Sequence, residues 1–163
     1  MSINFNDIEA LNISMNLEKE GQAFYAGAAD AVRNPEIKKV FNFLAAEEAD
    51  HYEMAKKLYE AHYKPELYSG EDELIMDDYL KRVVDAGVFP KADNIGTVIA
   101  NIRSDAEAIE MAFKAEVDTM KFFSDAMRNT NLPEGKEIFK ELIDQEKEHI
   151  RMLEVFRDER LRA

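Results

Sequence analysis

The sequence contains no cysteine, and it has few of the residues that interrupt helices. The lack of cysteine excludes disulfide bonds, thiol catalysis and thiolate-ligated metal centres, and it fits the reducing cytoplasm that we expect for this chain. Only 6 glycines and 4 prolines occur in 163 residues, which is too few for a turn-rich β sandwich. No stretch approaches the roughly 18 consecutive apolar residues of a membrane span. Residues 1–7 also lack the basic and apolar segments of a secretory signal.

Strong helix formers and acidic residues dominate the composition. Apolar residues make up 46 % and charged residues 34 % of the chain, a balance typical of amphipathic helices. The length predicts a single domain over residues 1–163. The formal net charge of −13 should repel nucleic acid and anionic membrane surfaces, so we expect neither as a partner. Any metal ion would have to bind through carboxylates and imidazoles.

The chain contains an internal repeat. Residues 10–60 align without a gap with residues 108–158, at an offset of 98. Twelve of the 51 aligned pairs are identical, and they include two of the three histidines, each with a glutamate three residues earlier. We interpret this as two copies of one helical hairpin, over about residues 8–62 and 94–161, joined by a crossover of about residues 63–93.

Proline marks the turn inside each copy. Asn34-Pro35 and Asn131-Leu132-Pro133 should each end one helix and begin the next. The third long helix is predicted to begin near Asp93 or Asn94, either of which could cap it. A long crossover is required when the second and third helices of a bundle run parallel.

The crossover itself contains a candidate helix at 71–86. Its apolar residues are expected to pack either on the bundle or on a second subunit; these are Val83, Val84, Val88 and Phe89.

The repeated glutamates and histidines are expected to lie at one level of the bundle. Counting from each turn at about 1.5 Å per residue places all the repeated polar side chains about 21–26 Å along their helices. Two hairpins related by a pseudo-twofold axis would therefore bring together four carboxylates and two imidazoles. The candidate ligands are Glu18, Glu48, His51, Glu116, Glu146 and His149.

Charge balance favours metal ions among these side chains. Each glutamate lies in line with apolar neighbours, where an unpaired carboxylate is costly, and no lysine or arginine occurs on the same stripes at that level. Two divalent cations would balance four carboxylates, and such ligands suit iron or manganese, with zinc also possible. The alternative is a structural bundle without metal, because one Glu-x-x-His alone is usually a surface pair.

Other polar residues near the site receive simpler interpretations. Glu20, Glu47 and Glu53 fall off the inner faces and are expected in solvent, and His62 is expected to be exposed at a helix end. Tyr25 is interpreted as a core residue that could hydrogen-bond a ligand glutamate.

The sequence resembles the ferritin-like superfamily, and within it the rubrerythrin-like proteins. The matching text is residues 17–25, Glu47-Glu48-Ala49-Asp50-His51, Ala115-Glu116 with Phe122-Phe123, and Gln145-Glu146-Lys147-Glu148-His149. The resemblance implies a four-helix bundle with two iron ions held by the six candidate ligands.

The resemblance also implies an oxidoreductase that reacts with hydrogen peroxide or dioxygen. It departs from rubrerythrins at two points. Without cysteine there is no rubredoxin-type iron site, so an external electron-donor protein is expected, and the extra glutamate one turn beyond the third-helix ligand is Thr119 here. A ferroxidase or iron-storage protein is the alternative function, and a homodimer is expected from the habit of the family.

Overall fold

The computed structural model describes residues 7–63, 87–90 and 94–162, without the side chains of 159–162. Every regular element within these ranges is a helix, so the predicted all-α class is confirmed. The helices are α1 (Asp7–Ala31), α2 (Pro35–His62), α4 (Ile95–Ala100), α5 (Asp105–Asn129) and α6 (Pro133–Arg162).

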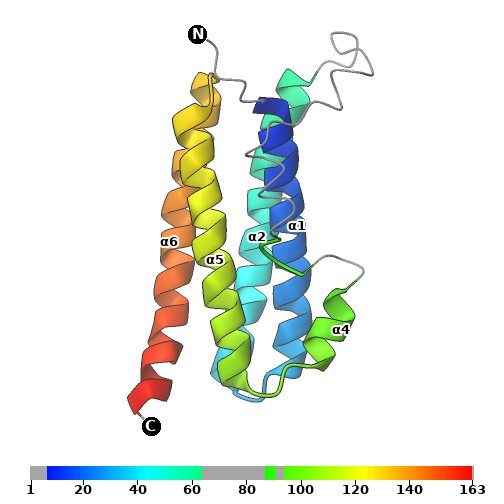
Figure 1. Ribbon diagram of the computed structural model, residues 1–163, viewed down its shortest axis with the longest axis vertical. Coiled ribbons are helices and arrows are strands. Elements are labelled where there is room, and N and C mark those ends of the chain that lie inside the picture. Colours follow the sequence, from blue (N-terminus) through cyan, green and yellow to red (C-terminus); the bar gives the residue numbers. More distant parts are fainter. Residues whose placement is uncertain (1–6, 64–86, 91–93, 163) are drawn as a thin grey trace.

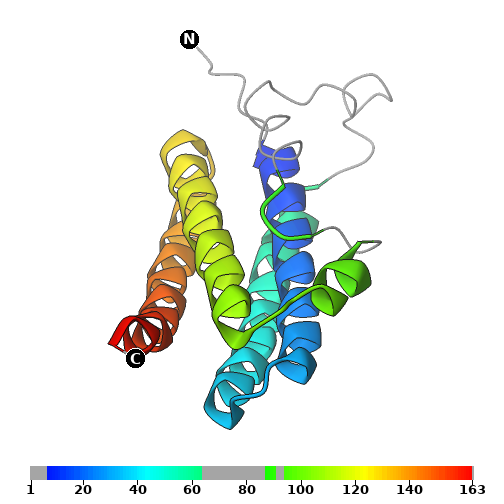
Figure 2. The ribbon, with the colours of Figure 1, turned by 60° about the horizontal axis from the view of Figure 1, so that its bottom comes forward.

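The four long helices form two hairpins that pack against each other. α1 and α2 lie side by side as one pair, and α5 and α6 form the other pair (Figure 1, Figure 2). α2 and α5 point in the same direction, as expected for two hairpins joined by a long connection (Figure 1). The predicted pair of hairpins is therefore present. None of the described helices carries an apolar stretch sufficient to cross a bilayer.

The predicted turns begin their helices where expected. Pro35 is the first residue of α2, and the side chain of Asn34 accepts a hydrogen bond from the backbone N–H of Glu36 at 2.8 Å. Pro133 likewise begins α6. Each proline lacks only an N–H that would have no partner inside the helix.

The predicted start of the third long helix is wrong by about ten residues. Asn94 does precede a helix, but this helix is the short α4, and the Asn94 side chain makes no capping bond. Ser104 adopts an extended conformation and caps α5 instead, accepting from the N–H of Glu107 at 3.1 Å. The side chain of Glu107 also accepts from the backbone N–H of Arg103 at 3.1 Å. This local capping network ends the earlier helix and starts the new one.

The described residues between α2 and α5 pack on the first hairpin. α4 lies beside α1 (Figure 1), where Ile99 occupies the space that a side chain at Gly27 would fill. Phe89 is buried against Phe24 and Tyr25, with ring centroids 5.9 and 6.2 Å away. Phe89 and the partly buried Val88 therefore pack on the bundle. The predicted helix at 71–86, with Val83 and Val84, lies outside the described residues.

Matching contacts tie the two hairpins together at both ends. Asp105, the first residue of α5, accepts hydrogen bonds from the backbone N–H groups of Arg33 and Asn34 in the α1–α2 turn, each at 2.8 Å. At the opposite end, the hydroxyl of Thr130 in the α5–α6 turn donates to Asp7, the first residue of α1. Asp7 and Asp105 are separated by the repeat offset of 98, so both ends follow the pseudo-twofold relation.

The core consists of two apolar clusters with a polar layer between them. One cluster includes Phe24 and Phe41 toward the α1–α2 turn, and the other includes Leu17, Phe122 and Phe139 toward the α5–α6 turn. The repeated glutamates and histidines lie between these clusters along all four long helices. The fold therefore encloses this polar layer within apolar packing.

Candidate metal centre

All six predicted site residues lie in the polar layer, and each is at most 2 % exposed. Each long helix contributes to the layer, because the turns place equivalent positions at equal distances along the helices. α1 provides Glu18, α2 provides Glu48 and His51, α5 provides Glu116, and α6 provides Glu146 and His149.

One half of the centre forms around His51. Its Nδ1 atom lies 3.4 Å from Oε2 of Glu18, 3.7 Å from Oε2 of Glu48 and 3.2 Å from Oε1 of Glu146. These four residues offer ligand atoms that all lie within 4.8 Å of one another. The group thus combines three carboxylates and one imidazole from three helices.

The other half forms around His149 in the same way. Its Nδ1 atom lies 3.4 Å from Oε1 of Glu116, 3.6 Å from Oε1 of Glu48 and 3.2 Å from Oε2 of Glu146. Glu48 and Glu146 therefore belong to both halves, and each directs one carboxylate oxygen toward each histidine. Shared carboxylates of this kind are suited to bridge two metal ions.

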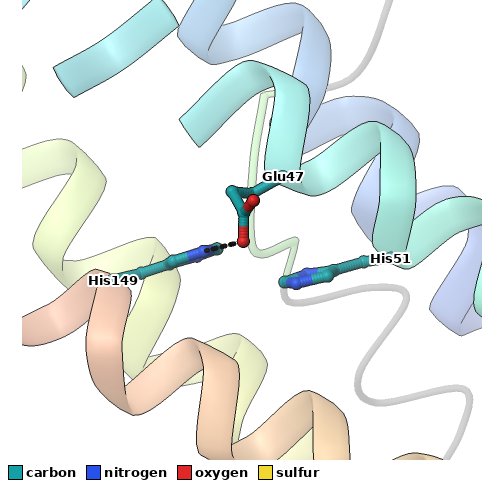
Figure 3. Close-up of side chains that lie close together, drawn as sticks. All are labelled: Glu47, His51 and His149. Carbon is teal, nitrogen blue, oxygen red and sulfur yellow. Dashed lines mark ion pairs between the residues drawn. The ribbon is translucent and has the colours of Figure 1, made fainter. Parts of the chain in front are cut away.

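The two imidazoles stack on each other across the centre. Their ring centroids are 5.2 Å apart and their planes differ by 12°. The outer nitrogen, Nε2, of His51 contacts the amide oxygen of Gln145, and that of His149 lies 3.9 Å from Oε2 of Glu47 (Figure 3). The expectation that Glu47 is in solvent is therefore wrong, since its side chain is only 31 % exposed and points toward the histidines.

Two further residues complete the surroundings of Glu116. The hydroxyl of the fully buried Tyr25 donates a hydrogen bond to Oε1 of Glu116, as the sequence suggested. Burial, followed by the nearby charges of Glu116 and Glu48, raises the pKa of Tyr25, so the phenol keeps its proton. Thr119 lies one turn beyond Glu116 and is buried, and its hydroxyl has no partner among the described residues.

The donor atoms of this layer lack the partners that buried polar groups normally have. Among the described residues, ten buried side-chain nitrogen and oxygen atoms have no hydrogen-bond partner, and nine belong to the six site residues. Unpaired buried polar atoms are costly, and here they converge on two points. The donor set of carboxylate oxygens and imidazole nitrogens fits Fe, Mn or Zn. The residues present therefore fit a pair of divalent metal ions.

In the protein without metal, shared protons would reduce the repulsion between the carboxylates. Burial, then the charge of Glu48, raises the pKa of Glu18 well above its usual value, and burial with the charges of Glu146 and Glu48 does the same for Glu116. Burial also opposes ionisation of Glu48 and Glu146. Close contacts with neighbouring carboxyl and imidazole groups outweigh this effect and lower both pKa values. In the pair Glu18–Glu48, and again in the pair Glu116–Glu146, the first carboxyl group keeps its proton more readily and the second ionises more readily.

Both histidines are held as cations by the same network. Burial alone would favour neutral imidazole, but the adjacent carboxyl groups of Glu116, Glu146 and Glu48 raise the pKa of His149 to about 12. The adjacent carboxyl groups of Glu146, Glu18 and Glu48 outweigh burial at His51 and raise its pKa as well. The positive charges of the two imidazolium ions then balance the negative charges of two carboxylates. In the metal-free protein, protons thus provide the positive charge that metal ions would provide.

The remaining polar residues singled out from the sequence lie away from this layer. Glu53 is exposed, as expected. Glu20 is half-buried. His62 ends α2 with its side chain 33 % exposed, 4.0 Å from Glu134.

The fold is that of ferritin-like proteins. A solved two-domain protein from Anabaena variabilis, which contains DJ-1/ThiJ/PfpI-like and ferritin-like domains, is similar over 96 % of this chain at a TM-score of 0.69 and 16 % identity. The chain spans only 40 % of the length of that protein. A hypothetical protein from Pyrococcus furiosus is similar over 95 % of this chain and 90 % of its own length, with a TM-score of 0.64 and 21 % identity.

Within this class, the sequence identifies the family. Residues 9–155 match the model of the rubrerythrin family, and the chain belongs to that family. The matched range contains all six residues of the polar layer. No match was found among the curated proteins.

Proposed function

We propose that the chain binds two iron ions in the polar layer and acts as an oxidoreductase toward hydrogen peroxide or dioxygen. The observation that carries this proposal is the convergence of four carboxylates and two imidazoles, with Glu48 and Glu146 shared between both halves. Membership of the rubrerythrin family supports it. Glu18 and His51 would hold one ion, Glu116 and His149 the other, and the two shared glutamates would bridge them.

When bound, two iron(II) ions supply the two electrons that, with two protons, convert hydrogen peroxide into two water molecules. The protein's own residues provide the surroundings that this chemistry requires. The apolar clusters on both sides of the layer exclude bulk water, which strengthens electrostatic interactions inside it. The protonated phenol of Tyr25 holds Glu116 in place through its hydrogen bond. We propose a separate protein as the electron donor, because the sequence has no cysteine for a rubredoxin-type iron site.

Anaerobic loading with iron(II), followed by rapid mixing with peroxide or with dioxygen, tests the proposal. We expect about two iron ions per chain and a change in visible absorbance that requires the loaded protein. A rate with peroxide that exceeds the rate with dioxygen would assign the peroxidase role. Protein that binds no stoichiometric iron would leave only the structural bundle, and a multi-subunit shell with a mineral core would support iron storage instead.

A further inference from the structure

The two histidines of the centre have different partners at their outer nitrogens. Each partner comes from the other hairpin. Gln145 on α6 faces His51 on α2. Glu47 on α2 faces His149 on α6 (Figure 3). Glu47 and Gln145 are separated by the repeat offset of 98, and each directly precedes a shared glutamate. The same position of the repeat therefore carries a carboxylate in one copy and a neutral amide in the other.

The contacts orient both side chains toward the imidazoles. The Nε2 group of Gln145 donates to Oε1 of Glu141 at 3.4 Å, and this leaves its amide oxygen to contact Nε2 of His51. Oε2 of Glu47 lies 3.9 Å from Nε2 of His149, which is an ion-pair separation. This nitrogen is buried and has no hydrogen-bond partner among the described residues, and the Glu47 carboxylate lies within ion-pair distance of it.

We propose that Glu47 and Gln145 are positioning residues that make the two metal sites unequal, with the ion at His149 held more tightly. The inference rests on the metal centre proposed above. An imidazole that binds metal through Nδ1 carries its remaining proton on Nε2 and donates it to an outer partner. Such a partner fixes the orientation of the ring and raises its basicity. At 3.9 Å the Glu47 carboxylate acts on the imidazole of His149 through its negative charge, whereas the Gln145 amide that contacts His51 is neutral and carries no such charge.

The arrangement also allows a competing role for Glu47. Its carboxylate and the two histidines form a third group whose ligand atoms lie within 4.8 Å of one another. A metal ion bound there would require ligand atoms from imidazoles that already use Nδ1 for the central pair. An imidazole that binds metal through both nitrogens must lose both protons, so the geometry favours Glu47 as an acceptor rather than a ligand.

Anaerobic titration with cobalt(II) tests the inference in four forms of the full chain: wild type, Glu47→Gln, Gln145→Glu and the double exchange. Calorimetry and the visible cobalt absorption give the two stepwise dissociation constants. We expect Glu47→Gln to weaken one step by about 10-fold and leave the other within about twofold, as outer partners typically change affinity 10- to 100-fold. Gln145→Glu should tighten the weaker step, and the double exchange should retain two unequal sites.

Proton NMR of the cobalt protein gives a readout that a merely structural role would not move. The two exchangeable Nε2 protons should appear as separate paramagnetically shifted signals. Glu47→Gln should shift one of them and Gln145→Glu the other. Glu53→Gln is the matched control, because it removes the same charge from an exposed position on α2 and should change neither signal nor either constant.

Each remaining outcome would overturn the inference in a distinguishable way. Two cobalt ions bound with unchanged constants and signals in both variants would refute the inference and leave the proposed centre intact. A third cobalt ion that is lost in Glu47→Gln would identify Glu47 as a ligand. Wild-type protein that binds no cobalt, and no iron either, would refute the metal centre together with the inference.

Discussion

The two hairpins carry the same candidate ligands but surround them differently. Tyr25 in the first hairpin donates a hydrogen bond to Glu116, whereas the equivalent residue of the second hairpin is Phe123, which has no hydroxyl. Gly21 and Thr119 also occupy equivalent positions of the repeat, and they too differ. A Cβ at Gly21 would lie 3.1 Å from the ring of Phe89 and 3.4 Å from the carboxyl carbon of Glu48.

The crossover explains part of this difference. Phe89 and α4 both pack on α1, so the first hairpin needs a glycine where a segment approaches closely. At the equivalent position the second hairpin has Thr119, which is buried. The candidate ligands are therefore the same in both hairpins. The residues around them differ, because the segment between α2 and α5 packs on the first hairpin.

The largest effect is expected from the residues that both halves share. Glu48→Ala or Glu146→Ala should abolish binding of both metal ions, because each removes a carboxylate oxygen from both groups. Glu18→Ala removes an oxygen from one group only and should leave about one ion per chain. Metal analysis after anaerobic loading measures the difference, with circular dichroism to confirm that the variants fold. Equal loss in all three variants would contradict the assignment of shared and separate ligands.

Protons provide the next test, because all six residues titrate together. The raised pKa values of Glu18, Glu116, His51 and His149 favour the protonated form of each group in the metal-free protein, and metal ions must displace these protons. Groups with raised pKa values favour the metal-free form as the pH falls, so binding should strengthen as the pH rises. The combined constant for two ions should rise by at least about two decades per pH unit near neutrality, because both imidazolium protons are displaced.

Calorimetry in buffers of different ionisation enthalpy counts the released protons. Release of one proton or fewer would mean that the carboxylates and imidazoles are already deprotonated before metal binds. Glu53→Gln again serves as a control, since an exposed carboxylate should not alter the count.

Most of the fold could be predicted from the sequence because each copy of the repeat independently indicates the same helical hairpin. Pro35 and Pro133 mark the two turns, and equal spacing from those turns places all six polar side chains at one level. The start of α5 could not be predicted in this way. Both Asn94 and Ser104 are good capping residues, and only the bonds around Glu107 distinguish them.

Helical periodicity gave a wrong expectation for Glu47, which lies outside the inner stripes. Glu47 lies beside the apolar stripe of α2, and its role depends on a histidine of the other hairpin, which no local spacing reveals. The repeat did contain a usable signal, because Gln145 occupies the equivalent position. Asp7 and Asp105 could likewise have been found by extending the alignment three residues toward the N-terminus. Positions of the repeat at which the two copies differ, such as Glu47 and Gln145, therefore point to residues around the site that the identical positions do not reveal.

The smallest effect is expected from the phenol that only one half possesses. Tyr25→Phe removes the hydrogen bond to Glu116 and leaves the ring in its apolar surroundings, so the metal-free protein should lose about 1 kcal/mol of stability. Phe123→Tyr is the matched exchange, and it places a hydroxyl at the equivalent position of the second hairpin. Denaturant unfolding and stepwise cobalt titration should show that Tyr25→Phe affects one binding step by less than about 10-fold. Equal changes in both steps would show that the phenol acts on the whole centre, and the difference between the hairpins would then have to arise from Glu47 and Gln145.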